Sequence, residues 1–267
     1  PLDDDRFDHQ SAADAKSFGV KSQVMSAGED SGHLGGEPIC LLATDEQRES
    51  QNVASSDTDC ESEREAAGDN RRSMVNRLRS EFGLPADKCL ALYAGNIGRK
   101  QGLEIILESA QQCADRTDLH FVICGRGAAF DHFVEMSRGL GNLQWLPVQP
   151  FERFNDLMNC ADIHLLPQRS GAADLVMPSK LTGMLATGRA IVASADPGTQ
   201  IADVVEGKGL VVPPSDATRF ADAVCRLQDD SDLRQALGRE GRHYALAHLS
   251  RESILRQFEQ DLQSLVR

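Results

Sequence analysis

A glycine-rich segment with two adjacent cations, Gly95–Gly102, has the composition of an anion-binding loop. It follows the apolar run 89–92, which predicts a buried strand, and it precedes apolar residues at helical spacing over 103–110. Glycine lets the backbone turn tightly and approach a ligand closely. The following helix would direct unpaired N–H groups and its positive dipole end at the loop, where Arg99 and Lys100 add full charges. The segment predicts a phosphate site, and the alternative is a plain strand-to-helix turn with two solvated cations.

A second segment with unusual chemistry lies about 70 residues further along the chain. A long loop of small residues after Leu166 ends in Pro178 and Ser179, which are residue types favoured at a helix start. Lys180 then stands in the first helical turn, where a cation opposes the helix dipole. The stability of the helix does not explain a lysine at this position, whereas binding of a negatively charged diphosphate would explain it. The alternative is a lysine whose ammonium group extends into water.

Two shorter loops carry weaker signals. Gly125, Arg126 and Gly127 form a glycine turn with one cation, which either adds positive charge beside the first loop or is a plain turn. The segment 147–150 has a proline at each end. Its backbone at Val148 either hydrogen-bonds a flat heterocycle or belongs to a turn that the prolines mark.

These loops are positioned by a regular alternation of strands and helices. Six short apolar runs separated by helical patterns predict an α/β fold with a doubly wound, Rossmann-like, six-stranded parallel sheet. Ligands of such folds bind at the carboxyl ends of the strands, where all four loops would lie. The predicted strands are 90–94, 119–124, 143–146, 163–166, 190–193 and 210–212. The predicted helices between them are 103–114, 129–138, 151–160, 179–187 and 199–206, and three that cover the sheet follow at 216–228, 231–246 and 251–266.

Charge divides the chain at about residue 70. Residues 1–70 contain 17 Asp and Glu against 5 Lys and Arg, whereas residues 71–267 contain 24 against 23. Neither part has the basic excess that is typical of nucleic-acid-binding proteins, so nucleic acid is not an expected partner. We expect a mostly disordered acidic segment over 1–72 and a folded domain over 73–267.

Composition and motif searches exclude several classes of protein. The seven cysteines are scattered without a C-x-x-C pair, which favours a reducing, cytoplasmic compartment. No run of about 18 apolar residues is present to span a membrane. The sequence has no metal-ligand spacing, nucleophile elbow or dinucleotide fingerprint, so neither a metal nor a cofactor is expected. His164 lies within an apolar strand and is predicted to be a core residue rather than a catalytic base.

The order and spacing of two motifs resemble those of one family. The motifs are GNIGRKQG at 95–102 and ADLVMPSKLTGMLATGRAIV at 173–192. They are similar to those of the C-terminal, nucleotide-sugar-binding domain of retaining GT-B glycosyltransferases, in the branch that builds bacterial exopolysaccharides such as colanic acid and O-antigen. The similarity covers residues 73–267. It implies that 2–7 end an interdomain linker, that 8–70 are an insertion, and that an N-terminal acceptor-binding domain is missing from this chain.

The resemblance assigns roles to residues of the first loop. Lys100 matches the lysine that neutralises the donor's diphosphate. Asn96 takes the place where many relatives have a second phosphate-binding arginine. The resemblance implies that this contact is weakened, or that Arg99 or Arg126 supplies it.

The second motif departs from the family pattern at two positions. Ser179 and Lys180 match the helix start that faces the phosphates and the donor sugar, but Leu175 and Gly183 stand where many relatives have glutamates for the sugar and the ribose. Asp174 is the nearest carboxylate and would take over a sugar hydroxyl. The resemblance thus assigns catalysis to Lys100, Asp174 and Lys180, and donor binding to Gly95, Asn96, Gly98, Arg99, Gly125, Arg126, Val148, Pro178, Ser179 and Gly183.

The implied reaction is transfer of a sugar from a nucleoside diphosphate sugar to a glycan or lipid-linked acceptor, with retained configuration. Cations and helix N-termini would stabilise the diphosphate leaving group, so no metal is required. The missing domain would position the acceptor, and the full-length protein would act in the cytoplasm, in part at the inner membrane. Two alternatives stay open: a non-catalytic nucleotide-sugar-binding or scaffold module, and a sugar-nucleotide epimerase, for which the chain offers few carboxylates and histidines.

Overall fold

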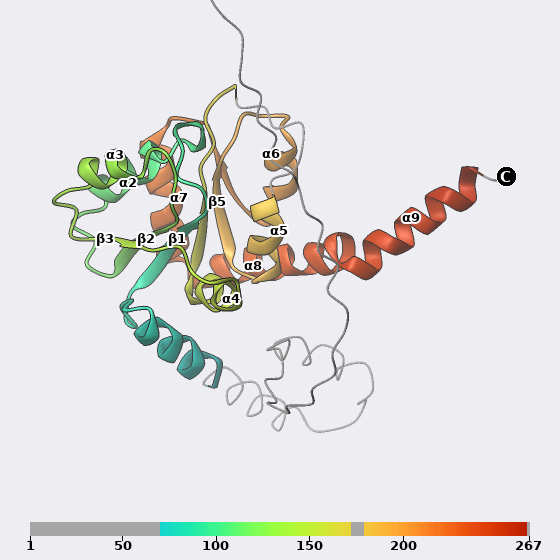
Figure 1. The fold of residues 1–267 in the computed structure, drawn as a ribbon, viewed down its shortest axis with the longest axis horizontal. Helices are drawn as coiled ribbons and strands as arrows, with labels where there is room; N and C mark the ends of the chain where they lie inside the picture. Colours follow the sequence, from blue (N-terminus) through green and yellow to red (C-terminus); the bar gives the residue numbers. More distant parts are fainter. Residues whose placement is uncertain (1–69, 172–178, 266–267) are drawn as a thin grey trace, which may run out of the picture. The chain divides into compact units, whose positions relative to one another are not determined.

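The sheet has the predicted doubly wound arrangement. The computed structural model describes residues 70–171 and 179–265, so the predictions for residues 1–69 of the acidic segment lie outside it. Residues 70–72, predicted to belong to that segment, are helical instead and begin the helix that precedes the sheet. Six parallel strands lie in the order β3-β2-β1-β4-β5-β6, so the chain builds outward from β1 in one direction, then crosses to β4 and builds in the other (Figure 1). The strands are β1 (Cys89–Ala94), β2 (Leu119–Cys124), β3 (Leu143–Leu146), β4 (Ile163–Leu166), β5 (Ala190–Ser194) and β6 (Gly209–Val212).

The helices follow the predicted order with small shifts at their ends. A helix over 70–81 precedes the sheet, and a 3-10 turn, η1 (Arg99–Gln101), stands in the loop after β1. The helices that follow are α2 (Glu104–Gln112), α3 (Phe130–Met136), α4 (Phe151–Cys160), α5 (Ser179–Ala186), α6 (Gln200–Val205), α7 (Ala217–Asp229), α8 (Ser231–Tyr244) and α9 (Arg251–Leu265), with a π turn, η2 (Ala245–Leu249), before α9.

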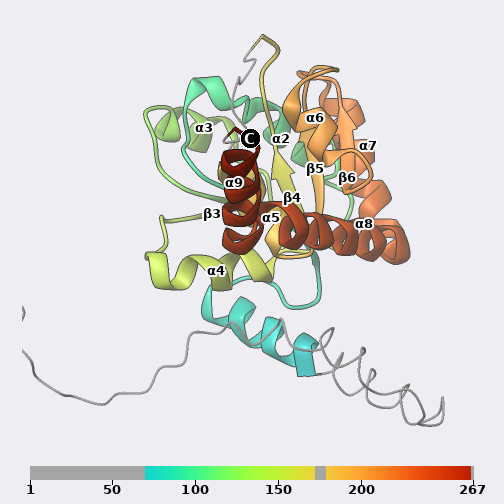
Figure 2. The same ribbon diagram turned by 90° about the vertical axis from the view of Figure 1, so that its right-hand side faces the viewer.

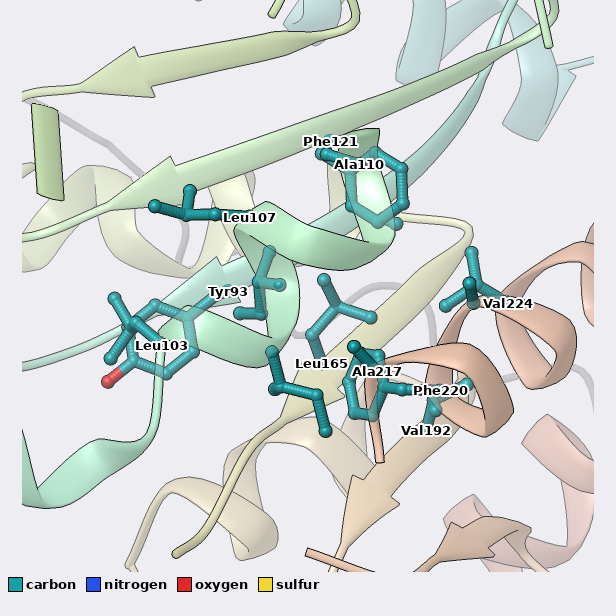
Figure 3. Close-up of a cluster of buried hydrophobic side chains, with 14 of the residues drawn as sticks. Tyr93, Leu103, Leu107, Ala110, Phe121, Leu165, Val192, Ala217, Phe220 and Val224 are labelled. Carbon is teal, nitrogen blue, oxygen red and sulfur yellow. The ribbon is translucent and has the colours of Figure 1, made fainter. Parts of the chain in front are cut away.

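Each face of the sheet has its own hydrophobic core. Successive strand residues point to opposite faces, so Ala91 and Tyr93 of β1 enter one core while Leu90, Leu92 and Ala94 enter the other. Figure 3 shows the first core, where side chains of α2 and α7 meet those of the strands. Because both faces are covered, the strands are apolar runs rather than alternating patterns.

The helices divide between these two cores. Helices α2, α3 and α7 contribute to the first core, and α4, α5 and α6 contribute to the second (Figures 1 and 2). This arrangement leaves the carboxyl ends of the strands, with their connecting loops, as the edge where a ligand would bind.

The last helix differs from the prediction. Helix α9 was expected to cover the sheet, yet none of its residues is buried within the described part of the chain. Ile254, Phe258 and Leu262 keep 48–61% of their surface exposed. The helical spacing of these apolar residues correctly predicted a helix, but spacing alone does not say which surface a helix meets.

A buried arginine fastens the helix over 70–81 to the sheet. The Arg79 guanidinium donates to the Cys160 carbonyl oxygen (2.8 and 3.0 Å), to the Lys88 carbonyl oxygen (3.0 Å) and to the Asp162 carboxylate (2.7 Å). The same carboxylate accepts the Leu90 N–H (2.8 Å) at the start of β1. Arg79 thus joins three chain segments through one planar group, a geometry that lysine does not reproduce.

We expect Arg79→Ala to lower the free energy of unfolding by about 3 kcal/mol, because it leaves buried acceptors without a donor. Arg77 on the same helix is the matched control, since its side chain is 83% exposed and, among the described residues, forms an ion pair only with Glu81. Arg77→Ala should change the unfolding free energy by less than about 0.5 kcal/mol. Urea unfolding measures both, and equal effects would contradict the role given to Arg79.

Candidate diphosphate site

The loops after β1 and β2 continue side by side beyond the ends of their strands. The Gly95 N–H donates to the Cys124 carbonyl oxygen (2.9 Å). The backbones approach so closely that a Cβ at Gly125 would lie 1.9 Å from the Gly95 carbonyl oxygen. A Cβ at Gly127 would lie 2.2 Å from the Ile97 carbonyl oxygen. The glycines of the second loop are therefore required by contact with the first, a reason that the sequence alone did not reveal.

The loop after β4 packs against the other end of the first loop. Gly102 has a left-handed φ of 69° and faces the backbone of Gln168 and Arg169, whose atoms would lie 3.4 Å from a Cβ there. The Arg169 guanidinium also forms an ion pair with Glu104, the first residue of α2. The start of the β4–α5 loop is thus fixed to the end of the β1–α2 loop.

Lys180 brings helix α5 against the beginning of the same loop. Its Nζ donates to the Tyr93 hydroxyl (3.1 Å) and lies 5.0 Å from the centre of the Tyr93 ring. The lysine side chain passes over Gly95, where a Cβ would lie 2.8 Å from Nζ. The structure therefore brings into direct contact the two motifs that the sequence singled out.

A third anchor holds the β4–α5 loop from the side of β5. The Asp196 carboxylate accepts the Gly171 N–H (3.2 Å) and the Ser170 hydroxyl (3.3 Å). Ser194, at the end of β5, accepts the Gln168 N–H (2.9 Å) and donates to its carbonyl oxygen (3.0 Å). The loop that leads toward Lys180 is therefore held on both sides as far as Gly171.

The two cations of the first loop stand at this edge and face solvent. Arg99 and Lys100 lie in the η1 turn, which Gly98 precedes, and both are exposed, as is Asn96. Within residues 70–171 and 179–265, neither cation forms a hydrogen bond or ion pair through its side chain. Their charges are therefore not neutralised by neighbouring carboxylates in this part of the chain.

The other two loops supply one more cation and an exposed apolar side chain. The Arg126 guanidinium lies over the ring of Phe130, the first residue of α3, 4.3 Å from its centre. Val148 is 61% exposed, in a loop that the Cys124 thiol ties down by donating to the Pro147 carbonyl oxygen (3.1 Å). Both residues lie at the predicted edge of the sheet, because their loops follow β2 and β3.

Helix α5 is described from Ser179 onward, and Gly183, which has no side chain, stands one turn later. Gly183 is exposed, and apart from its chain neighbours and its own helix backbone no atom of the described residues lies within 4 Å of where its Cβ would be. This is the position where the family resemblance implies a glutamate for the ribose. Asp174, Leu175 and Pro178 lie outside the described residues.

His164 is a core residue, as predicted. It is fully buried, its Nε2 lies 3.0 Å from the Thr187 hydroxyl, and burial lowers its pKa to about 3, with the nearby Arg189 charge adding to the shift. The imidazole stays neutral at physiological pH.

Among the described residues, no three His, Cys, Asp or Glu side chains lie close enough together to bind a metal ion. No described helix is long and apolar enough to cross a membrane.

The structure adds residues to the site that sequence reasoning missed. Tyr93 lies within the predicted strand 90–94, and nothing in the sequence assigns a role to its hydroxyl. Arg169, Glu104 and Asp196 are ordinary surface charges by type, and their partners lie 25 to 65 positions away. Only the topology of the sheet brings such pairs together.

Residues 88–230 match the family described as glycosyl transferases group 1. The chain is also 36% identical over 198 residues to the protein of Escherichia coli K12 named "Putative colanic acid biosynthesis glycosyl transferase WcaI", an alignment that covers 70% of this chain and 46% of WcaI. The chain belongs to the group 1 glycosyltransferases. It spans about half the length of the curated relatives that it matches, including D-inositol 3-phosphate glycosyltransferase of Corynebacterium diphtheriae, which is 28% identical and of which 40% is covered.

Two solved structures have the same fold as this chain. The C-terminal domain of the group 1 glycosyltransferase LpcC from Francisella tularensis aligns over 93% of its length and 66% of this chain, with a TM-score of 0.56 and 16% identity. HepE (Alr3699) from Anabaena, solved in complex with UDP, aligns over 55% of its length and 73% of this chain, with a TM-score of 0.61 and 16% identity. The described domain thus has the fold of the C-terminal half of a GT-B glycosyltransferase.

The contact between the glycine loops predicts the effect of one added methyl group. Gly127→Ala should lower the unfolding free energy by about 1–3 kcal/mol, because the new Cβ collides with the Ile97 carbonyl oxygen. Gly141→Ala is the control, since in the part of the chain that the structure describes no residue beyond its chain neighbours has an atom within 4 Å of its Cβ position. Urea unfolding should find the control within about 1 kcal/mol of the original chain. A harmless Gly127→Ala would show that the loops are not in contact.

The buried histidine predicts a dependence of stability on pH. Because the folded pKa of His164 is about 3 and the unfolded value is about 6.5, the unfolded chain binds the extra proton between these values. Stability should therefore fall on acidification, with a loss from His164 of about 2 kcal/mol between pH 7 and pH 5. Urea unfolding of His164→Gln at both values should lack this part of the loss, while an unchanged loss would contradict the assignment.

Proposed function

We propose that this domain binds the diphosphate of a nucleotide sugar at the carboxyl edge of the sheet, as the donor-binding half of a glycosyltransferase. The observation that carries the proposal is the contact of Lys180 with the loop that bears Arg99 and Lys100. Two segments distant in sequence thereby place three cations at one edge, beside two helix N-terminal regions. Membership of the group 1 glycosyltransferases supports this use of the edge.

The chemistry of such a site is stabilisation of a leaving group. As the bond between sugar and diphosphate breaks, negative charge grows on the diphosphate, and fixed cations favour that state over the ground state. Lys100 and Lys180 are the residues to which we assign this role, with Arg99 beside them. We further propose that Asp174 contacts a sugar hydroxyl and that transfer proceeds with retained configuration, as the motif resemblance implies.

Recognition of the nucleoside would use the neighbouring loops. We propose that the backbone around Val148, whose side chain is exposed, meets the base. The space over Gly183, which no described neighbour fills, would receive the ribose without a carboxylate from that position. HepE, which shares the fold, was solved with UDP and with UDP-glucose, and this supports a nucleotide sugar as the ligand class. We propose that the acceptor is a glycan or lipid-linked glycan of exopolysaccharide synthesis, on the strength of the similarity to WcaI.

A second candidate function is a binding module without transferase activity. The bare helix position at Gly183 favours it, because a ribose-binding carboxylate is expected there. An assay of the full-length protein, with the rest of the polypeptide present, separates the two candidates. Sugar transfer to any acceptor excludes the binding module, whereas tight donor binding without transfer supports it.

The proposal is tested by titrating the chain with UDP-, GDP- and ADP-sugars in a calorimeter. At least one should bind, and Lys100→Ala should weaken that binding about tenfold or more, because a hydrogen bond to a charged group is worth about 1.5–3 kcal/mol. Lys88→Ala is the matched control. Lys88 directly precedes β1 and so lies at the opposite edge of the sheet.

Three outcomes are informative. Weaker binding by Lys100→Ala alone supports the phosphate role of this loop. Equal affinity of Lys100→Ala and the original chain refutes that role while leaving nucleotide-sugar binding intact. Absence of binding to all three sugar nucleotides by the original chain refutes the proposed function as a whole.

A further inference from the structure

The hydroxyl group of Tyr93 lies at the junction of the two segments that form the candidate site. The phenol ring is buried in the first hydrophobic core, near the end of β1, and Figure 3 shows it among the side chains of this core. Its hydroxyl leaves this core and reaches both segments. It donates to the Asn96 carbonyl oxygen (2.7 Å) and accepts from Lys180 Nζ (3.1 Å).

We propose that Tyr93 is a positioning residue that holds the Lys180 ammonium group against the β1–α2 loop, and so sets the geometry in which the donor's diphosphate is bound. The inference rests on the proposed function of this edge. It adds a residue that acts through Lys180 and need not touch the ligand.

The direction of the hydrogen bonds makes Tyr93 suited to this role. A phenol has one proton to donate and lone pairs to accept. Its proton is directed at the Asn96 carbonyl oxygen, which can only accept, so the lone pairs remain for the ammonium group. Burial raises the pKa of Tyr93 above its usual value, so the hydroxyl keeps its proton throughout the physiological range.

The ring and the glycine beside it fix the path of the lysine. The ammonium group lies 5.0 Å from the ring centre and 3.1 Å from the hydroxyl oxygen, so it sits at the hydroxyl end of the ring. Gly95 leaves room for the lysine chain, since a Cβ there would lie 2.8 to 3.2 Å from the last atoms of the side chain. The Tyr93 hydroxyl, the Tyr93 ring and the absence of a side chain at Gly95 thus together define the position of the Lys180 ammonium group.

Tyr93→Phe tests the proposal because it removes only the hydroxyl and keeps the buried ring. We expect the nucleoside diphosphate that binds best among UDP, GDP and ADP to bind about fivefold more weakly, as the loss of one hydrogen bond predicts. Tyr244→Phe is the matched control. Tyr244 is the other tyrosine of the chain, and Lys208 Nζ lies 4.7 Å from its ring centre, but it stands on α8. The Tyr244→Phe variant should bind the nucleoside diphosphate with the affinity of the original chain.

A double-mutant cycle separates positioning from simple support of the loop. In a Lys180→Met chain, adding Tyr93→Phe should change the affinity by less than about 1.5-fold, because the hydroxyl then has no ammonium group to hold. An equal fivefold loss in both backgrounds would overturn the proposal, since the hydroxyl would then act through Asn96 alone. An unchanged affinity of Tyr93→Phe in the chain that retains Lys180 would also overturn the proposal.

The contact itself has a spectroscopic readout that does not depend on ligand binding. With ¹³Cζ-labelled tyrosine the chain gives two signals, and Tyr93→Phe identifies one of them. Lys180→Met should shift the Tyr93 signal and leave that of Tyr244 in place, and an unmoved Tyr93 signal would contradict the contact.

The binding experiments distinguish failure of the proposed function from failure of the inference about Tyr93. If the original chain binds no nucleotide, the proposed function fails and the positioning role fails with it. If it binds but the cycle shows no coupling, only the inference about Tyr93 fails.

Discussion

The close approach of backbones at the carboxyl edge is the constraint on which the rest of the site depends. The loop after β1 is fixed on one side by the glycines at 125 and 127, whose positions leave no room for a side chain, and on the other by the segment 168–169. This contact does not depend on any one functional side chain. It gives the loop a defined shape before a ligand arrives, which reduces the ordering cost of binding.

The same arrangement determines which charges remain available for an anion. Two carboxylates of the described residues at this edge are engaged: Glu104 pairs with Arg169, and Asp196 accepts from the backbone and hydroxyl groups of 170–171. The acidic groups therefore anchor the β4–α5 loop, while Arg99 and Lys100 face solvent. Positive charge collects at the edge even though residues 71–267 contain 24 acidic and 23 basic residues. The formal charge of a domain says little about the field at one site.

Much of this fold could be predicted from the sequence because the strands are short, apolar and separated by helices, which leaves few topologies to consider. The two motifs could also be recognised, because glycines beside cations and a lysine at a helix start have few local explanations. The roles of Tyr93, Arg169 and Asp196 could not, since each depends on a partner from another strand end. Helix α9 was predicted correctly as a helix from its apolar periodicity. That periodicity did not show that its apolar side chains stay exposed.

The central claim is that the loop at 95–102 and the start of α5 bind one diphosphate between them. A crystal structure of the chain with bound UDP, GDP or ADP tests it most directly. The account predicts that the two phosphates lie within hydrogen-bonding distance of both Lys100 and Lys180, at the carboxyl edge of β1 and β4. Phosphates bound at any other edge or face of the sheet, or in contact with only one of the two segments, would contradict it.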